Sequence, residues 1–194
     1  MRSARAVRTT GETDIDVRLN IDGSGEYDLS SGVPFFDHML TMLSKHGLMD
    51  LTVTCVGDVD VDDHHTVEDI GITLGQAFAD ALGGKAGICR YASLTLPMDE
   101  TLVLISLDIS GRPFLSYDVD FQCPYTGTFD ASLMEEFLRA FAFAAGITLH
   151  VKLIHGKNTH HILEAIMKGL ARALDAATKV DPRVTGVPST KGSL

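Results

Sequence analysis

The sequence predicts an α+β fold made of two similar half-domains, in which two mixed sheets pack against helices. Three observations carry this prediction. A short signature occurs twice, as HHTVEDI at 64–70 and HHILEAI at 160–166. At that offset of 96 residues, seven of 18 positions from His64 are identical, where chance would give roughly one or two. Strand-like and helix-like stretches follow in the order ββαβα approximately twice, without the regular alternation of a doubly wound sheet.

The first half, residues 1–86, begins with alternating apolar side chains, which are typical of half-buried strands. Apolar residues at helical spacing then predict two amphipathic helices, the second of which ends at Gly83-Gly84. The expected elements are two strands within Arg5–Asp22 around Thr10-Gly11, a turn-rich stretch DGSGEYDLSSG, a helix over 35–48 that Gly47 stops, a strand Leu51–Val56 and a helix over 65–82.

The second half, residues 87–180, repeats this order, and a polar arm, residues 181–194, follows it. The gapless match also places Leu51-Thr52-Val53 over Ile147-Thr148-Leu149, so each repeat unit should end in strand, loop and helix. The expected elements are strands at Ala92–Leu96, Leu102–Ile109 and Phe114–Phe121, a helix Ala131–Ala145, a strand Ile147–Leu153 and a helix over 159–178.

Composition narrows the class of protein. The net charge of −10 argues against a nucleic-acid binder, which needs clustered Lys and Arg. No run of 18 apolar residues and no basic-then-apolar leader is present, so we expect neither a membrane span nor secretion, and a cytoplasmic enzyme is the default. Three scattered cysteines fit reduced thiols rather than a thiolate zinc site.

Each histidine pair indicates a transition-metal site. On a helix, His64 and His65 both lie one turn before Glu68, but adjacent helical residues diverge by about 100°. The two histidines of a pair therefore cannot easily serve one ion, and the simplest geometry sends them to two metals. His160, His161 and Glu164 repeat this arrangement. Mixed His and Glu ligands suit Mn, Fe, Co, Ni or Zn, whereas calcium sites use oxygen.

Other candidates are single residues. His38 and His46 lie eight apart on the first predicted helix and could face the same cleft, although each could be a surface histidine. Glu136 takes the place of His38 in the second half, as a ligand or as a solvated residue. The acidic run before His64 is either a solvated loop or a field that favours a cation. Arg90, Arg112 and Lys191 stand outside the helices beside Gly, Pro or Ser/Thr, as an anionic phosphate would need.

Several segments together resemble imidazoleglycerol-phosphate dehydratases, and the likeness covers almost the whole chain. They are ETDIDVRLNIDGSG, FFDHMLTMLSKHG, DDHHTVEDIG, PMDETL, HGKNTHHILEA and the terminal PSTKG. The resemblance implies a duplicated half-domain of the ribosomal protein S5 domain 2-like fold, in the monofunctional form without a phosphatase domain. It also implies assembly into 24 subunits with sites between them.

The resemblance further implies the chemistry. The substrate would be D-erythro-imidazole-glycerol phosphate, which loses water to give imidazole acetol phosphate in L-histidine biosynthesis. The proton to be lost is not next to a carbonyl, and the family solves this by binding the ring as imidazolate between two Mn²⁺ ions in each site.

Site residues carried over from the family fall into three groups. The metal ligands would be His38, His64, His65, Glu68, Glu136, His160, His161 and Glu164. Glu136 departs from family members that carry histidine there. Glu12 matches the general base and His46 a substrate-side histidine, so the catalytic set would be Glu12, His46, Glu68 and Glu164. The substrate would contact Glu12, His38, His46, Arg90, Arg112, Ser189, Thr190 and Lys191.

Two other functions remain open from the residues alone. A metal-buffering or metal-sensing protein would explain the histidine pairs but would leave Arg90, Arg112 and Lys191 without a role. A dinuclear metallohydrolase usually bridges its ions with Asp or Glu, and Asp is nearly absent from the duplicated signature.

Overall fold

The computed structural model describes residues 1–192 and Leu194. Two four-stranded sheets have the same strand order, β1-β2-β4-β3 and β5-β6-β10-β7. In each sheet the first three strands pair antiparallel and the last pairs parallel, as β3 with β4 and β7 with β10. The strands of the first sheet are β1 (Ser3–Thr9), β2 (Thr13–Asn20), β3 (Tyr27–Ser30) and β4 (Asp50–Gly57). Those of the second are β5 (Tyr91–Met98), β6 (Thr101–Asp108), β7 (Phe114–Asp118) and β10 (Thr148–His155).

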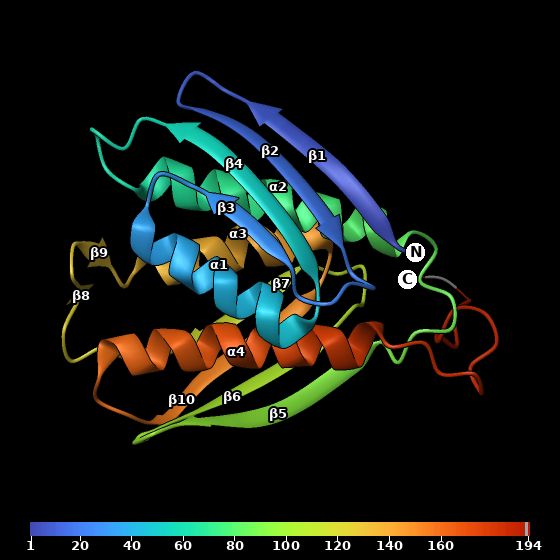
Figure 1. Cartoon of the computed structure of the whole chain (residues 1–194). Coiled ribbons are helices and arrows are strands. Elements are labelled where there is room, and N and C mark those ends of the chain that lie inside the picture. Colours follow the sequence, from blue (N-terminus) through green and yellow to red (C-terminus); the bar gives the residue numbers. More distant parts are fainter. Residues whose placement is uncertain (193) are drawn as a thin grey trace.

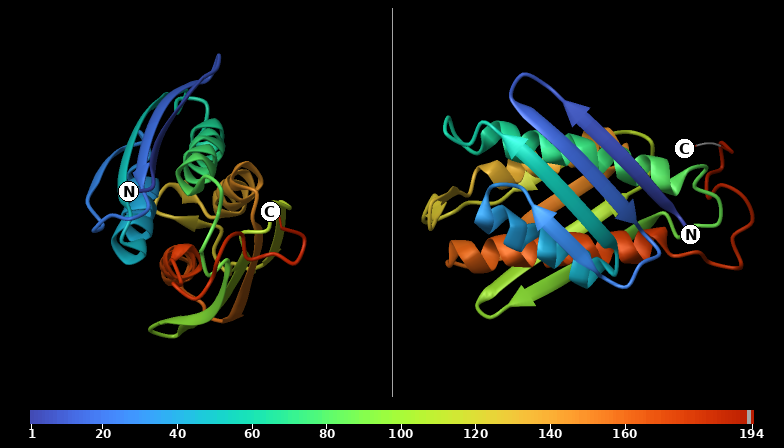
Figure 2. Two further views of the ribbon diagram at one scale, coloured as in Figure 1. Left: turned by 90° about the vertical axis from the view of Figure 1, so that its right-hand side faces the viewer. Right: turned by 45° about the horizontal axis from the view of Figure 1, so that its top comes forward.

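Four helices lie between the two sheets (Figures 1 and 2). Helix α2 packs on the first sheet and α4 on the second, while α1 contacts α4 and α2 contacts α3 across the middle. Each sheet buries one face against this helical layer, and β2 shows the resulting alternation, with Ile15, Val17 and Leu19 buried. The helices are α1 (Pro34–Gly47), α2 (His64–Leu82), α3 (Leu133–Ala145) and α4 (Thr159–Thr178).

The duplicated α+β fold is confirmed, with three corrections of detail. The turn-rich stretch, in which no strand was expected, contains β3, because Tyr27–Ser30 pairs in parallel with β4. Gly47 does not itself stop α1: it is the last helical residue, and Leu48 adopts the left-handed conformation with φ 54°. Gly47 lies close to α4: a Cβ there would be 3.3 Å from the carbonyl oxygen of Ala171, and 2.7 Å from the flexible end of the Met49 side chain, which would have to move. A small hairpin of β8 (Tyr125–Thr126) and β9 (Phe129–Asp130) precedes α3 and was not predicted.

The two halves align with a gap in the structure, although the apolar pattern of the sequence matches without one. Leu51 pairs with Leu19 in the first sheet, and Leu149 pairs with Leu107 in the second, so these two leucines are structural equivalents. The gapless match of Leu51 to Ile147 is therefore wrong by two residues. A shift of two keeps the same face of a strand buried, so the apolar pattern looks unbroken. The two extra residues lie between the strand and the histidine pair: six residues, 58–63, separate β4 from His64, whereas four, 156–159, separate β10 from His160.

Among the described residues, no helix combines the length and the apolar character that crossing a membrane requires.

Candidate metal centre and substrate site

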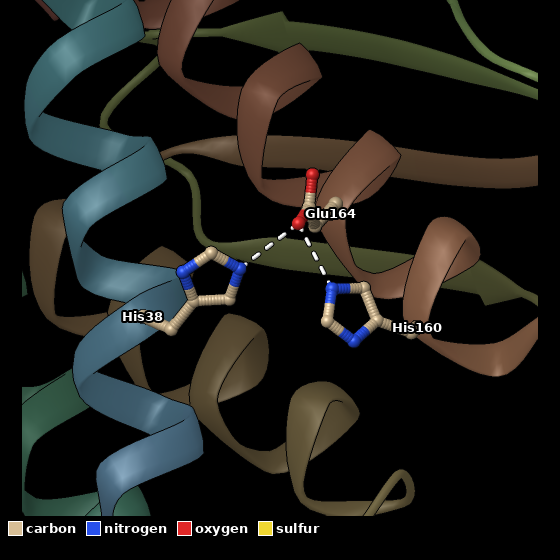
Figure 3. Close-up of side chains that lie close together, drawn as sticks. All are labelled: His38, His160 and Glu164. Atoms are coloured by element: carbon tan, nitrogen blue, oxygen red, sulfur yellow. Dashed lines mark hydrogen bonds and ion pairs between the residues drawn. The ribbon is translucent and has the colours of Figure 1, made fainter.

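Three of the predicted ligands meet between α1 and α4 (Figure 3). Nε2 of His38 and Nε2 of His160 each lie 2.9 Å from Oε1 of Glu164. One ligand atom from each residue lies within 4.8 Å of the other two, which is close enough for a single ion to bind all three. Two imidazoles and a carboxylate are a donor set that suits a divalent first-row metal, so these residues fit the metal that the sequence predicts.

Local structure explains how these side chains converge. Asn158 caps α4, since its side chain accepts hydrogen bonds from the backbone N–H groups of His160 and His161. The cap begins the helix so that His160 and Glu164 stand one turn apart on the face toward α1. Helix α1 begins at Pro34 and presents His38 from the opposite side, with Phe35 packed against both histidine rings.

Glu164 is held as an anion. Burial disfavours its charge, but hydrogen bonds from Lys168, His38 and His160 outweigh that effect and lower its pKa to about 2. Lys168, one turn further along α4, donates to the second carboxylate oxygen. The repeated signature did not indicate Lys168, because the equivalent residue in the first half, 96 positions earlier, is Ile72. Its spacing of four residues from Glu164 was the available signal.

The counterpart cluster in the other helix pair is looser. His64 Nε2 lies 3.6 Å from Glu68 Oε2 on α2. Glu136 on α3 is equivalent to His38 on α1. The two residues are 98 positions apart, and so are Leu48 and Gly146, the left-handed residues that end the two helices. The side chain of Glu136 lies 4.0 Å from Arg139, and among the described residues it forms no hydrogen bond or ion pair with His64 or Glu68. The structure thus places Glu136 on the neighbouring helix without closing the cluster.

The second histidine of each pair points elsewhere, as the helical geometry predicts. His65 lies beside Asp58 and Glu12, and its side chain is 34% exposed. His161 lies beside Glu100 and is 26% exposed. Hydrogen bonds to Asp58 and to Glu100 raise the pKa of the respective imidazole. Neither ring joins the His38 cluster, so any metal that these two histidines bind must receive its other ligands from elsewhere.

His46 lies at the last turn of α1, on the Lys168 side of the cluster. Burial, followed by the charges of Lys168 and Arg172, lowers its pKa. The lowered pKa favours the neutral ring, which can both donate and accept a hydrogen bond.

The expected phosphate contacts gather at one place, but not beside the metal cluster. Arg90 forms a two-pronged pair with Asp108 and donates to the Pro188 carbonyl at 2.8 Å. Arg112 is exposed and lies 3.9 Å from the same Asp108. The arm folds back here, since a Cβ on Gly111 would lie 2.7 Å from the carbonyl carbon of Leu194. Ser189, Thr190 and Lys191 belong to this arm, and Ser189 Oγ accepts from the Lys191 N–H at 3.2 Å.

The two groups lie at opposite ends of α4 (Figure 1). The Arg90 N–H donates to the carbonyl of Ala177 at 2.8 Å, near the end of the helix, whereas Glu164 lies in its second turn. At 1.5 Å per residue, the helix separates them by about 20 Å. Glu12 is also remote from the arm, because β1 begins where Arg2 contacts Thr178 and then runs about 23 Å to the Glu12 hairpin.

Comparisons with known proteins agree on one family. A sequence profile for imidazoleglycerol-phosphate dehydratase matches residues 31–174. The imidazoleglycerol-phosphate dehydratase of Caldanaerobacter subterraneus subsp. tengcongensis is 57% identical over the full length of both chains. The crystal structure of the Staphylococcus aureus enzyme superposes with a TM-score of 0.84 at 38% identity, covering 92% of this chain and 99% of that one. That of the Pyrococcus furiosus enzyme in complex with (S)-C348 gives the same score and identity, covering 97% and 99%.

Proposed function

Because the chain belongs to the imidazoleglycerol-phosphate dehydratase family, whose members are hydro-lyases, we propose that it dehydrates D-erythro-imidazole-glycerol phosphate to imidazole acetol phosphate at a two-manganese site. The observation that carries the proposal is the convergence of His38, His160 and Glu164, with a related donor set on α2 and α3. The same assignment makes the chain a cytoplasmic enzyme of L-histidine biosynthesis.

The ligand sets follow the repeat. His38, His160 and Glu164 would hold one ion, and His64, Glu68 and Glu136 the other, while His65 and His161 would reach ions bound by neighbouring chains. When bound, the ions would stabilise the substrate ring as its anion, so that the ring could donate electrons and help to expel hydroxide from the carbon attached to it. The ion at His64 would have two carboxylate ligands, Glu68 and Glu136, whereas the ion at His38 would have only one, Glu164. The two ions would therefore be bound with different strength.

Glu12 is the residue that we propose takes the carbon-bound proton. Its carboxylate stands at a hairpin tip, half exposed, and its nearest charged partner is His65 Nε2 at 3.6 Å. That distance is longer than a hydrogen bond, so the carboxylate has a free lone pair to offer. His46, whose pKa is lowered by burial and then by the charge of Lys168, would orient the substrate at the ion held by His38, His160 and Glu164.

We propose that each catalytic site combines different chains. A substrate of this size cannot span the roughly 20 Å of α4 between Glu164 and Arg90. The Arg90, Arg112 and Lys191 group of one chain would therefore bind the phosphate of a substrate whose ring lies at the metal ligands of another. A closed homo-oligomer supplies this geometry at every site, and the family resemblance gives it 24 subunits.

A product assay tests the proposed function. The chain, stripped of metal and then supplied with Mn²⁺, should convert imidazole-glycerol phosphate to the keto phosphate with no release of inorganic phosphate. Phosphate release without keto product would instead support a metallohydrolase, and tight metal binding without any turnover would support a metal-buffering protein.

Lys191→Ala should lower kcat/KM by roughly 10- to 150-fold at unchanged metal content, since a charge-assisted hydrogen bond contributes about 1.5–3 kcal/mol. Truncation before Pro188 should cost more, because it also removes Ser189 and the carbonyl that Arg90 contacts. Steady-state kinetics with parallel metal analysis would measure both, with Lys157→Ala as a matched exposed lysine. If the truncated chain turned over substrate as the full chain does, the arm would have no part in the site.

Chelation should shrink the particle, because His65 and His161 would connect ions to neighbouring chains. Light scattering before and after removal of metal would measure the mass, and Mn²⁺ should restore the larger particle. An unchanged mass after complete metal removal would mean that the ions serve chemistry alone.

A further inference from the structure

The second histidine of each pair, His65 in the first half and His161 in the second, is called here the outward histidine. The two outward histidines are held in different ways, although the halves share one fold. The β1–β2 hairpin turns at Gly11-Glu12 and the β5–β6 hairpin at Asp99-Glu100, and a buried threonine, Thr13 or Thr101, follows each. Glu12 and Glu100 are thus equivalent residues on equivalent turns, 88 residues apart. Each faces the outward histidine of its own half.

Glu100 is fully engaged. Its Oε2 lies 2.7 Å from Nδ1 of His161. Its Oε1 accepts from the backbone N–H groups of Asn158 at 2.9 Å and Lys157 at 3.3 Å, in the loop that leads into α4. The contacts from His161 and then Asn158 lower the pKa of this carboxyl to about 2. Glu100 therefore fixes the ring and the loop that carries it.

Glu12 makes no such contact. The Nδ1 atom of His65 is already occupied by Asp58, at 3.0 and 3.2 Å from its two carboxylate oxygens. Asp58 is placed for this because its own N–H donates to the Glu12 carbonyl at 3.1 Å. Glu12 faces the other nitrogen, Nε2, at 3.6 Å. The carboxylate that orients His65 therefore comes from the loop, and the hairpin carboxylate is left without a hydrogen bond to the ring.

The difference follows from loop length. Asp58 opens the six-residue connection 58–63, whereas the corresponding connection 156–158 has three residues and no acid. With no carboxylate in the short loop, the hairpin glutamate of the second half takes the place at Nδ1.

We propose that Asp58 and Glu100 are positioning residues that hold the outward histidine of each half for metal binding, and that the longer first loop thereby leaves Glu12 free to act on the substrate. A carboxylate on Nδ1 keeps the proton there and leaves the Nε2 lone pair for a metal. The inference rests on the proposed function, to which it adds the division of labour between two equivalent glutamates.

The test compares one substitution at two equivalent places. The protein is stripped of metal and titrated with Mn²⁺ alone, so that reassembly accompanies binding in every variant, and the free ion is followed by its electron paramagnetic resonance signal. Glu100→Gln and Asp58→Asn should each weaken Mn²⁺ binding by about 10- to 100-fold, whereas Glu12→Gln should leave it unchanged. At saturating Mn²⁺, Glu100→Gln should recover most of its kcat and Glu12→Gln should not. Asp60→Asn and Asp120→Asn, exposed acids in the same regions, serve as matched controls.

Wild-type Mn²⁺ affinity in Glu100→Gln, or equal weakening in Glu12→Gln, would overturn the inference. If Glu100→Gln did not fold, Asp58→Asn would still decide it, since among the described residues the Asp58 side chain forms hydrogen bonds and an ion pair with His65 alone. Failure of the inference is distinct from failure of the proposed function, because the wild-type chain would still form the keto product with Mn²⁺.

Discussion

Glu164→Gln should lose its metal and almost all of its activity. The substitution keeps the size of the side chain but removes the only anion between His38 and His160 and leaves Lys168 without its partner. Loss of an outer carboxylate typically weakens metal binding 10- to 100-fold, so loss of a direct ligand should exceed about 100-fold and leave less than about 1% of the activity. Elemental analysis of the purified oligomer, alongside the product assay, would measure both effects.

The matched control is Glu135→Gln, which removes an exposed carboxylate paired with Arg139. It should retain metal and turnover. Glu68→Gln, at the equivalent place in the first half, should also lower metal content and turnover. A Glu164→Gln or Glu68→Gln oligomer with full metal content and full turnover would show that the duplicated signature is not the ligand set.

Glu12→Gln should lower kcat by roughly 10²-fold or more while the bound metal stays in place, as expected when a general base is lost. Glutamine keeps the shape of the hairpin tip but cannot accept the proton. Rapid-mixing kinetics at saturating Mn²⁺ and substrate would separate this loss from any change in KM.

Thr10→Ala is a useful comparison for Glu12→Gln, because it alters the same hairpin without removing the carboxylate. It should reduce thermal stability more than turnover. A near-normal rate for Glu12→Gln would remove Glu12 from the role of base and turn attention to the other acids near His65.

The fold could be predicted from the sequence to the extent that local pattern determines it. Apolar side chains at helical spacing predicted all four helices with an error of no more than two residues at any end, and the repeated signature predicted the duplication. Strand β3 escaped because its four residues lie in a Gly- and Ser-rich stretch, and its pairing partner β4 is more than twenty residues away. The gap in the repeat escaped because a two-residue shift preserves strand alternation.

The site could be predicted less completely, because it depends on distance in space. Spacing alone predicted that the two histidines of each pair diverge, and His65 and His161 do lie apart from the His38 cluster. Spacing could not predict that Arg90 and the arm lie at the far end of α4 from Glu164. Arg90 is distant from α4 in the sequence, and no motif links it to that helix. Spacing also could not distinguish Glu100, which lies 2.7 Å from Nδ1 of His161, from Glu12, which lies 3.6 Å from Nε2 of His65.

Mixed oligomers test most directly the central claim that one site is built from more than one chain. Glu12→Gln and a chain truncated before Pro188, each nearly inactive alone, would be co-expressed with different affinity tags and purified together. If a site takes Glu12 and the arm from different chains, one site in four of a random equal mixture has both intact, so activity should recover to about a quarter of wild type. Activity that remained at the level of the two variants measured separately would show that a single chain supplies the whole site.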